Sequence, residues 1–103
     1  MGRRITAQEA HRRMELGDAF ILLDVRTLRE FNQCRIDGAI CIPVEELADR
    51  AEKELPDKDA QILIYCQIGA RADSAAKYLI SMDYTNVSSF GGIVGWQYGT
   101  VKG

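Results

Sequence analysis

The sequence is poor in the side chains that most metal and proton-transfer sites use. Its 103 residues contain one histidine, His11, and three cysteines, Cys34, Cys41 and Cys66. Because their spacing fits neither a zinc site nor a disulfide framework, we expect reduced thiols and no metal or other cofactor. Cys34 and Cys41 are expected to pack as small buried hydrophobic residues. His11 lies far along the chain from the best candidate site, so we expect no catalytic role for it.

An excess of positive charge is also missing. The chain has 13 Lys and Arg against 15 Asp and Glu, a net charge of −2. This balance does not indicate a basic surface for binding nucleic acid or an anionic membrane. No apolar run approaches the roughly 20 residues of a membrane span, and residues 1–5 lead directly into a helix pattern without the apolar core of a signal peptide. We therefore expect a cytoplasmic protein whose partners are small molecules or proteins.

Strand and helix patterns alternate along the chain. Apolar runs typical of buried strands occur at residues 20–23, 40–42 and 62–65, and residues 87–90 are expected to form the last strand. Helical spacing or capping boxes mark residues 7–16, one or two turns after Thr27, 44–55 and 72–80. No linker or repeat divides the chain, so we expect one domain over residues 1–103. The pattern predicts an α/β fold with a central parallel sheet of about four to five strands and helices on both faces.

The most informative segment is the run Tyr65-Cys66-Gln67-Ile68-Gly69-Ala70-Arg71-Ala72, between a predicted strand and a predicted helix. Backbone N–H groups of such a loop can point inward, and the helix adds the positive end of its dipole. A thiolate is stabilised in that position without a histidine base. Ligands of open α/β sheets bind beyond the carboxyl ends of the strands, which is where Cys66 would lie. We therefore predict that Cys66 is a catalytic nucleophile.

The charged residues near this loop are expected to support the site rather than to react. A cation in the first turn of a helix opposes the helix dipole unless an anion compensates, so we expect Arg71 to attract an anionic substrate or to steady the loop. We expect Asp24, Arg26 and Glu30 to form a structural ion pair that braces the segment after the first buried strand.

Four segments together resemble the rhodanese family of sulfurtransferases in its single-domain form. They are Leu23-Asp24-Val25-Arg26 with Glu30-Phe31, Ile36 to Pro43, Cys66 to Arg71, and Gly91 to Trp96. They cover nearly the whole chain in the family's order. Arg35, Asp37 and Cys41 stand where the family usually has histidine, proline and asparagine. The glycines and Trp96 of the closing segment are expected to supply tight backbone and packing near the site.

The resemblance implies a single rhodanese-like domain and a mechanism. Cys66 would take sulfur from a small anionic donor such as thiosulfate, carry it as a persulfide and release it to a thiol or cyanide acceptor. Backbone amides of the loop would hold the negative sulfur. The predicted substrate-binding residues are Gln67, Ile68, Gly69, Ala70, Arg71 and Ala72. A sulfur-relay protein is a further candidate partner, whereas nucleic acid and membrane are not expected.

Two other functions stay open at this point. The domain could be a sulfur-carrier or protein-binding module that does not turn over. It could also be a small phosphatase or arsenate reductase. By resemblance, the sulfur-transferring members have four residues between the cysteine and the arginine, as here between Cys66 and Arg71, whereas related cell-cycle phosphatases have one more. The loop length therefore favours sulfur over phosphorus.

Overall fold

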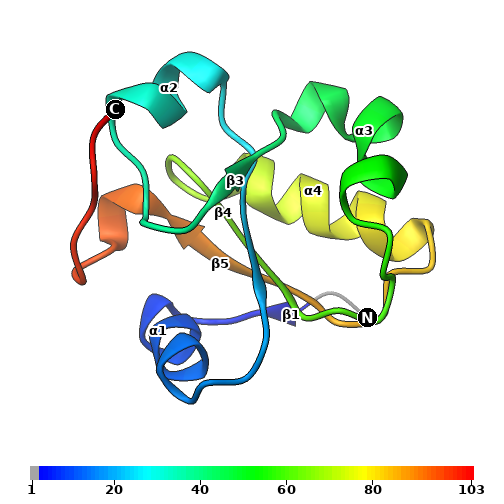
Figure 1. Cartoon of the computed structure of the whole chain (residues 1–103), viewed down its shortest axis with the longest axis horizontal. Helices are drawn as coiled ribbons and strands as arrows, with labels where there is room; N and C mark the ends of the chain where they lie inside the picture. Colours follow the sequence, from blue (N-terminus) through cyan, green and yellow to red (C-terminus); the bar gives the residue numbers. More distant parts are fainter. Residues whose placement is uncertain (1–2) are drawn as a thin grey trace.

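The computed structural model describes residues 3–103 as one parallel sheet with helices on both faces (Figure 1). The elements in chain order are β1 (Arg3–Arg4), α1 (Ala7–Glu15), β2 (Ile21–Asp24), α2 (Leu28–Gln33), β3 (Ile40–Cys41), the 3₁₀ helix η1 (Val44–Glu46), α3 (Leu47–Glu54), β4 (Ile62–Cys66), α4 (Ala70–Ser81), β5 (Val87–Gly92) and the 3₁₀ helix η2 (Ile93–Gly95). The strand order is β1-β5-β4-β2-β3, and every pair is parallel. The predicted fold class is therefore confirmed.

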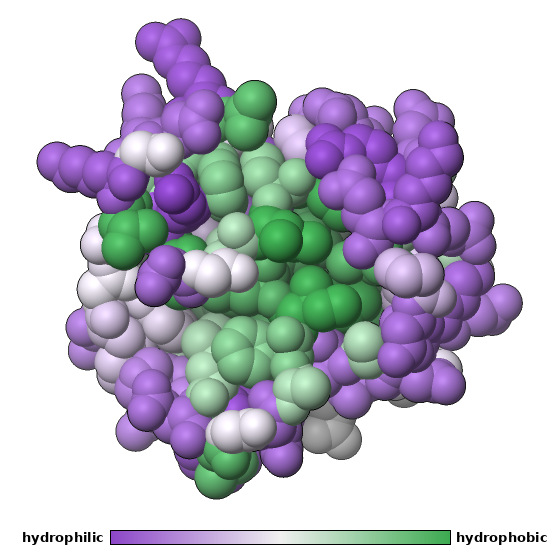
Figure 2. Space-filling model, viewed as in Figure 1, coloured by the Kyte–Doolittle hydropathy of each residue, from purple (hydrophilic) through white to green (hydrophobic). Residues whose placement is uncertain are grey.

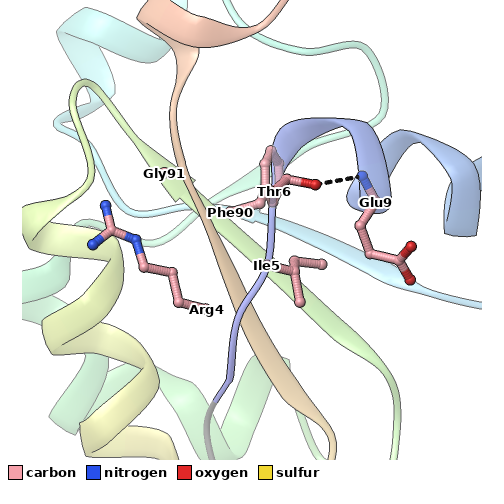
Figure 3. A pocket seen from close by; sticks show the side chains of 6 residues that line it. All are labelled: Arg4, Ile5, Thr6, Glu9, Phe90 and Gly91. Carbon is pink, nitrogen blue, oxygen red and sulfur yellow. Dashed lines mark hydrogen bonds between the residues drawn. The ribbon is translucent and has the colours of Figure 1, made fainter.

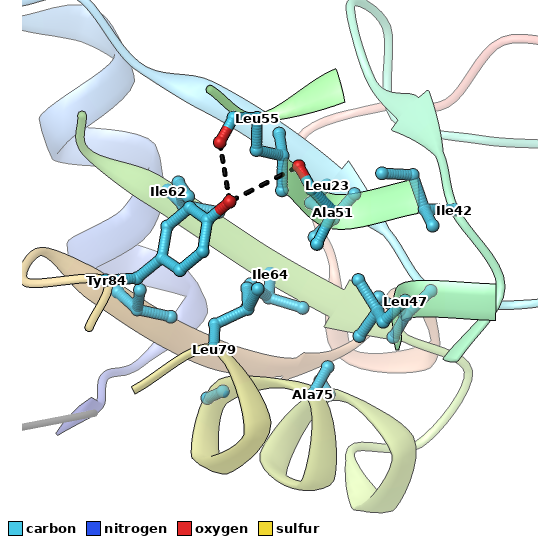
Figure 4. Close-up of a cluster of buried hydrophobic side chains, with 14 of the residues drawn as sticks. Leu23, Ile42, Leu47, Ala51, Leu55, Ile62, Ile64, Ala75, Leu79 and Tyr84 are labelled. Carbon is cyan, nitrogen blue, oxygen red and sulfur yellow. Dashed lines mark hydrogen bonds between the residues drawn. The ribbon is translucent and has the colours of Figure 1, made fainter. Parts of the chain in front are cut away.

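The core lies in two layers, one on each side of the sheet. On one side, α3 and α4 pack against the strands, and Leu47, Leu79 and Ile64 belong to this cluster (Figure 4). On the other side, α1 and the segment around Ile36 cover the sheet, with Ala10 in the cluster they form. Continuous burial of β4 follows from this arrangement, because a central parallel strand is covered on both faces.

A buried hydroxyl closes the carboxyl end of α3. Tyr84 donates hydrogen bonds to the carbonyl oxygens of Leu55 at 2.6 Å and Ala51 at 3.3 Å (Figure 4). The Ala51 carbonyl already accepts a hydrogen bond from the Leu55 N–H, whereas carbonyl groups at the very end of a helix have no partner within it, so the hydroxyl chiefly satisfies the Leu55 carbonyl. The predicted helix over residues 44–55 begins instead as the 3₁₀ turn η1, since the residue before it, Pro43, offers no side-chain cap.

The capping signals of the sequence are formed to different extents. The Thr27 hydroxyl accepts from the Glu30 amide, and the Glu30 carboxylate accepts from the Thr27 amide, so this capping box is complete. At α1, Thr6 caps the Glu9 amide, but the Glu9 carboxylate binds two arginines of its own helix. Both helices still begin where the sequence predicts.

Strand β1 was not predicted. Residues 1–5 were expected to lead directly into a helix, but Arg3 and Arg4 pair in parallel with Ser88 and Ser89 of β5, at one edge of the sheet. The helix does begin at Ala7, but the strand before it was missed because a strand of two polar residues has no periodic signal of its own and forms only by pairing with a distant strand. Residues 1 and 2 lie outside the described part of the chain. The pairing brings Arg4 to the same end of the sheet as Cys66.

A β-bulge bends β5 beside the end of β4. Ile64 pairs with Ser89, but Cys66 pairs with Gly92, so β5 has one residue more than β4 in this interval. Gly91 adopts a φ of 90°, which favours glycine and accommodates the extra residue. The bulge sets Gly91 and Gly92 against the loop that follows Cys66.

The molecular surface is mostly hydrophilic over the helices. Figure 2 shows apolar side chains in the middle of the face seen in Figure 1, framed by hydrophilic ones. Among the large apolar residues that stay exposed, Ile68 follows β4 and Val94 follows β5. Both therefore belong to segments near the predicted site.

Candidate active site

Cys66 is the last residue of β4, the central strand of the sheet. Only 1% of the residue is exposed, and it belongs to the core cluster on the α4 side. Its neighbours in the sheet hold its backbone in register with Gly92. The sulfur is therefore fixed at the carboxyl edge of the sheet, where the sequence predicted it.

The loop after Cys66 curls back over the sulfur. The Gly69 N–H donates to Cys66 Sγ at 2.9 Å, and Gly69 adopts a φ of 124° that other residues rarely take. The first hydrogen bond within α4 joins the Asp73 amide to the Gly69 carbonyl at 3.0 Å. The amides of the preceding helical residues thus have no partner in the helix, as at any helix N-terminus. The arrangement can stabilise negative charge on the sulfur.

The other predicted binding residues differ in their placement. Ile68 is 75% exposed at the tip of the loop, and Ala70 is also exposed. The Ala72 side chain is buried in the core, so only its backbone can serve the loop. Gln67 turns its side-chain oxygen to Arg26 Nη1 at 3.2 Å. The structure brings these residues together around one sulfur, while their contacts with a substrate stay a prediction.

Arg71 is held by Glu30. Its Nη1 and Nη2 donate to Glu30 Oε1 and Oε2 at 2.8 and 3.1 Å. These hydrogen bonds lower the pKa of Glu30 to about 2, despite an opposing contribution from burial. The pair joins the first turn of α4 to α2 and so steadies the loop. Glu30 had been expected to join Asp24 and Arg26, and this expectation was wrong because α2 carries it to α4.

Asp24 and Arg26 form the predicted structural ion pair. Their side chains are 0% and 2% exposed, and Arg26 donates to both carboxylate oxygens at 2.7 to 3.1 Å. Burial by itself would lower the pKa of Arg26, but the hydrogen bonds and charge of Asp24 raise it, so the guanidinium stays charged. Arg26 also donates to the Cys34 carbonyl at 2.6 Å and to Gln67. The pair therefore braces the active loop as well as the segment after β2.

Gly92 allows the closing segment to touch the loop. A Cβ at this position would lie 2.5 Å from the Gln67 carbonyl carbon and 2.6 Å from Ile68 Cα, closer than real Cβ contacts occur. At Gly95, by contrast, a Cβ would meet nothing within 4 Å. The expectation of tight backbone is confirmed at Gly92 and wrong at Gly95, because the closing segment last contacts the loop at Val94, whose N–H donates to the Gln67 carbonyl at 3.3 Å.

Sequence analysis missed Arg4. Its Nη2 lies 3.3 Å from the position that a Cβ of Gly69 would occupy, and its Nη1 lies 3.5 Å from Asp73 Oδ2. The side chain is 66% exposed, and it extends toward α4 in Figure 3. No local motif marks Arg4, because it reaches the loop only through the pairing of β1 with β5.

The remaining cysteines are not in the loop. All three cysteines are free, and Cys34 and Cys41 are half-buried rather than fully buried. Burial first, and then the charge of Asp24, raises the pKa of Cys41 to about 11, so this thiol stays protonated near neutral pH. Cys41 is therefore a poor nucleophile.

The rest of the described chain offers few other site features. His11 stacks on Tyr98 with ring centroids 3.8 Å apart and lies 3.5 Å from Glu15. Within residues 3–103, no group of three or more His, Cys, Asp or Glu side chains could hold a metal ion. None of the helices in this range has the length and apolar character needed to cross a membrane.

Comparisons with known proteins agree on one family. A model of the rhodanese-like domain matches residues 6–98. Thiosulfate sulfurtransferase PspE of Escherichia coli is 35% identical over 81 residues, which cover 79% of this chain and 78% of that protein. A sulfurtransferase of Allochromatium vinosum is 33% identical over 93 residues, covering 89% and 85%.

Solved structures give the same result. The solution structure of the rhodanese-like domain of the Anabaena Alr3790 protein has a TM-score of 0.87 and 32% sequence identity, covering 99% of this chain and 80% of that one. Together with the loop around Cys66, these similarities show that the chain belongs to the rhodanese-like domain family.

Proposed function

We propose that the protein transfers sulfane sulfur from an anionic donor such as thiosulfate to a thiophilic acceptor, with Cys66 as the nucleophile. The observation that carries the proposal is the Gly69 N–H at 2.9 Å from Cys66 Sγ, at the N-terminus of α4. An N–H and a helix N-terminus directed at a sulfur favour its anionic form and a negative atom attached to it. Relatives named thiosulfate sulfurtransferase and sulfurtransferase support this reading.

In the loading step, the Cys66 thiolate attacks the outer sulfur of thiosulfate. A bond forms between Sγ and that sulfur, the sulfur–sulfur bond of thiosulfate breaks, and its electron pair leaves with sulfite. Cys66 then carries a persulfide with the negative charge on the outer sulfur. Preorganised donors around such an anion contribute a few kcal/mol each in water-excluded sites, roughly 3–4 kcal/mol per donor.

In the release step, an acceptor thiol attacks the outer sulfur. A bond forms between the two sulfurs, the bond to Sγ breaks, and its electron pair stays on Cys66 as the thiolate. The thiol proton moves to the transferred sulfur, so the product is a persulfide of the acceptor. Two displacements through a covalent intermediate predict ping-pong kinetics. Neither displacement needs a histidine base.

The test is to incubate the purified protein with thiosulfate and measure its intact mass. We expect a gain of one sulfur atom, removed by cyanide, absent in Cys66→Ser and retained in the matched variant Cys41→Ser. Failure of the wild-type protein to gain sulfur would refute the proposal. So would hydrolysis of an aryl phosphate by a protein that thiosulfate leaves unmodified, because this result would favour a phosphatase.

A second measurement separates an enzyme from a carrier. With thiosulfate and cyanide in excess, an enzyme forms many equivalents of thiocyanate per Cys66. A sulfur-carrier or protein-binding module would load one sulfur and release little product. We expect steady-state turnover, and a single equivalent would instead assign the carrier function.

A further inference from the structure

The three arginines at the loop after Cys66 are not equally available to a substrate. Arg26 is 2% exposed and donates to Asp24, the Cys34 carbonyl and Gln67, and Arg71 is engaged by both oxygens of Glu30. An anionic substrate would have to compete with a carboxylate for either guanidinium. The Arg4 side chain is 66% exposed, and its ion pair with Asp73 is long at 3.5 Å. Arg4 can therefore bind a substrate at lower cost.

Arg4 also has a close spatial relation to the reacting sulfur. Its Nη2 lies 3.3 Å from the place where a Gly69 Cβ would stand, and the Gly69 N–H binds Cys66 Sγ. That same place is 3.6 Å from the Gly91 Cα, and the Gly91 carbonyl lies 4.0 Å from Cys66 Sγ. Gly69 thus lies next to both the guanidinium and the sulfur, and it has no side chain that would separate them.

A groove begins beside Arg4 and Gly91. It lies at the carboxyl ends of β1 and β5 and is lined by Arg4, Ile5, Thr6, Glu9, Phe90 and Gly91 (Figure 3). Arg4 lies on one side of β5, with Ile5 and Thr6 on the other. The lining thus combines the exposed cation of Arg4 with the half-buried Ile5, and it also includes the carboxylate of Glu9, which Arg12 and Arg13 of the same helix bind. Because Arg12 and Arg13 compensate the charge of Glu9, the Arg4 guanidinium is the charge in this lining that a ligand can use, and it suits a small organic molecule with one acid group.

We propose that Arg4 binds the acid group of the sulfur acceptor, so that Cys66 passes its sulfur preferentially to small organic thiols that carry a carboxylate. This inference rests on the proposed function, because it assigns the acceptor class of the release step. Arg4 acts on binding: the carboxylate pairs with the guanidinium while the acceptor thiol meets the outer sulfur of the persulfide. The bonds that form and break are those of the release step, and Arg4 gains and loses no proton.

The test uses protein already loaded with sulfur by thiosulfate and confirmed by mass. Release is timed with 3-mercaptopropionate, which carries an acid group, and with 2-mercaptoethanol, which is neutral. Rates are compared per concentration of acceptor thiolate, since the two thiols ionise differently. For Arg4→Gln we expect the second-order rate with 3-mercaptopropionate to fall about threefold to fivefold, as for the loss of one partly exposed ion pair. The rate with 2-mercaptoethanol should stay unchanged.

Three further measurements separate binding by Arg4 from a structural role. Lys77→Gln removes the same charge from an exposed position further along α4 and should leave both rates unchanged. Arg4→Lys should restore part of the preference. Salt at about 1 M, where the Debye length is about 3 Å, should remove the difference between wild type and Arg4→Gln. In Arg4→Gln, the concentration of 3-mercaptopropionate that gives half-maximal release should rise, while the release rate at saturation should stay unchanged.

The outcomes distinguish the two proposals. If wild-type protein loads sulfur but Arg4→Gln releases it to both thiols at wild-type rates, the inference about Arg4 is refuted and the proposed function stands. Equal losses with both thiols would also refute it, because Arg4 would then act on the loop. If thiosulfate does not load Cys66 at all, the proposed function fails and the inference fails with it.

Discussion

Gly92→Ala is expected to disable the site with little change to the rest of the fold. The glycine has φ −130° and ψ 160°, an extended conformation that alanine adopts readily, so the substitution causes no backbone strain at residue 92 itself. The added methyl group would instead lie 2.5 Å from the Gln67 carbonyl carbon and 2.6 Å from Ile68 Cα. Real Cβ atoms essentially never come within 3.0 Å of such atoms. The backbone on both sides of the contact must therefore move apart.

The expected loss of loading rate follows from the position of the atoms that must move. The atoms that the methyl group displaces belong to the two residues after Cys66, and Gly69, whose N–H binds the sulfur, is the next residue. A displacement of about 1 Å at a reacting centre can cost about a hundredfold in rate. We expect the rate of sulfur loading to fall about tenfold to a hundredfold. Overpacking of this kind also costs about 1–3 kcal/mol of the free energy of unfolding.

The assay is the second-order rate of Cys66 loading by thiosulfate, followed by intact mass, together with thermal unfolding. Gly95→Ala is the matched control, because it adds the same methyl group to the same closing segment where nothing lies within 4 Å. The control should load sulfur at the wild-type rate. Loading by Gly92→Ala within twofold of the control, at an unchanged melting temperature, would refute the reasoning.

Two further predictions concern the ion pairs around the loop. Arg26→Gln should lower the free energy of unfolding by about 3–5 kcal/mol in urea denaturation, because it leaves Asp24 buried without its counter-charge; a loss below about 1 kcal/mol would contradict this account. For Glu30, whose pKa is about 2 in the folded protein against 4.5 ordinarily, the pairing with Arg71 stabilises the fold above about pH 5 and less as pH falls toward 2. The stability difference between wild type and Glu30→Gln, measured by urea denaturation, should therefore shrink between pH 5 and pH 3, and a constant difference would argue against the pairing.

Much of the fold could be predicted because its signals are local. The four predicted strands occur with their ends shifted by at most two residues, and the helices begin at or near their capping residues. The position of Cys66 at the end of a buried strand was predicted in the same way. Apolar runs and capping residues act over a few neighbouring positions, so they can be recognised in the sequence without knowledge of distant contacts.

The partners of the charged residues could not be predicted in this way. Thr27 and Glu30 showed that a helix begins there, but the capping pattern could not show that Glu30 would also bind Arg71, 41 positions away. The close approach of Gly92 to Gln67 depends on the bulge between β4 and β5. Each of these contacts joins segments whose separation in space is set by the packing of the whole sheet.

The sequence by itself determined the order of strands and helices along the chain, the cysteine at the end of β4 and the length of its loop, because each depends on residue types within one segment. Only the tertiary structure decided which charges the loop can use. It engaged Arg71 with Glu30, buried Arg26 with Asp24, and brought Arg4 beside Gly69 by pairing β1 with β5. The physical reason is that an ion pair forms between whichever side chains the fold places within a few ångströms, and their separation along the chain does not determine that distance.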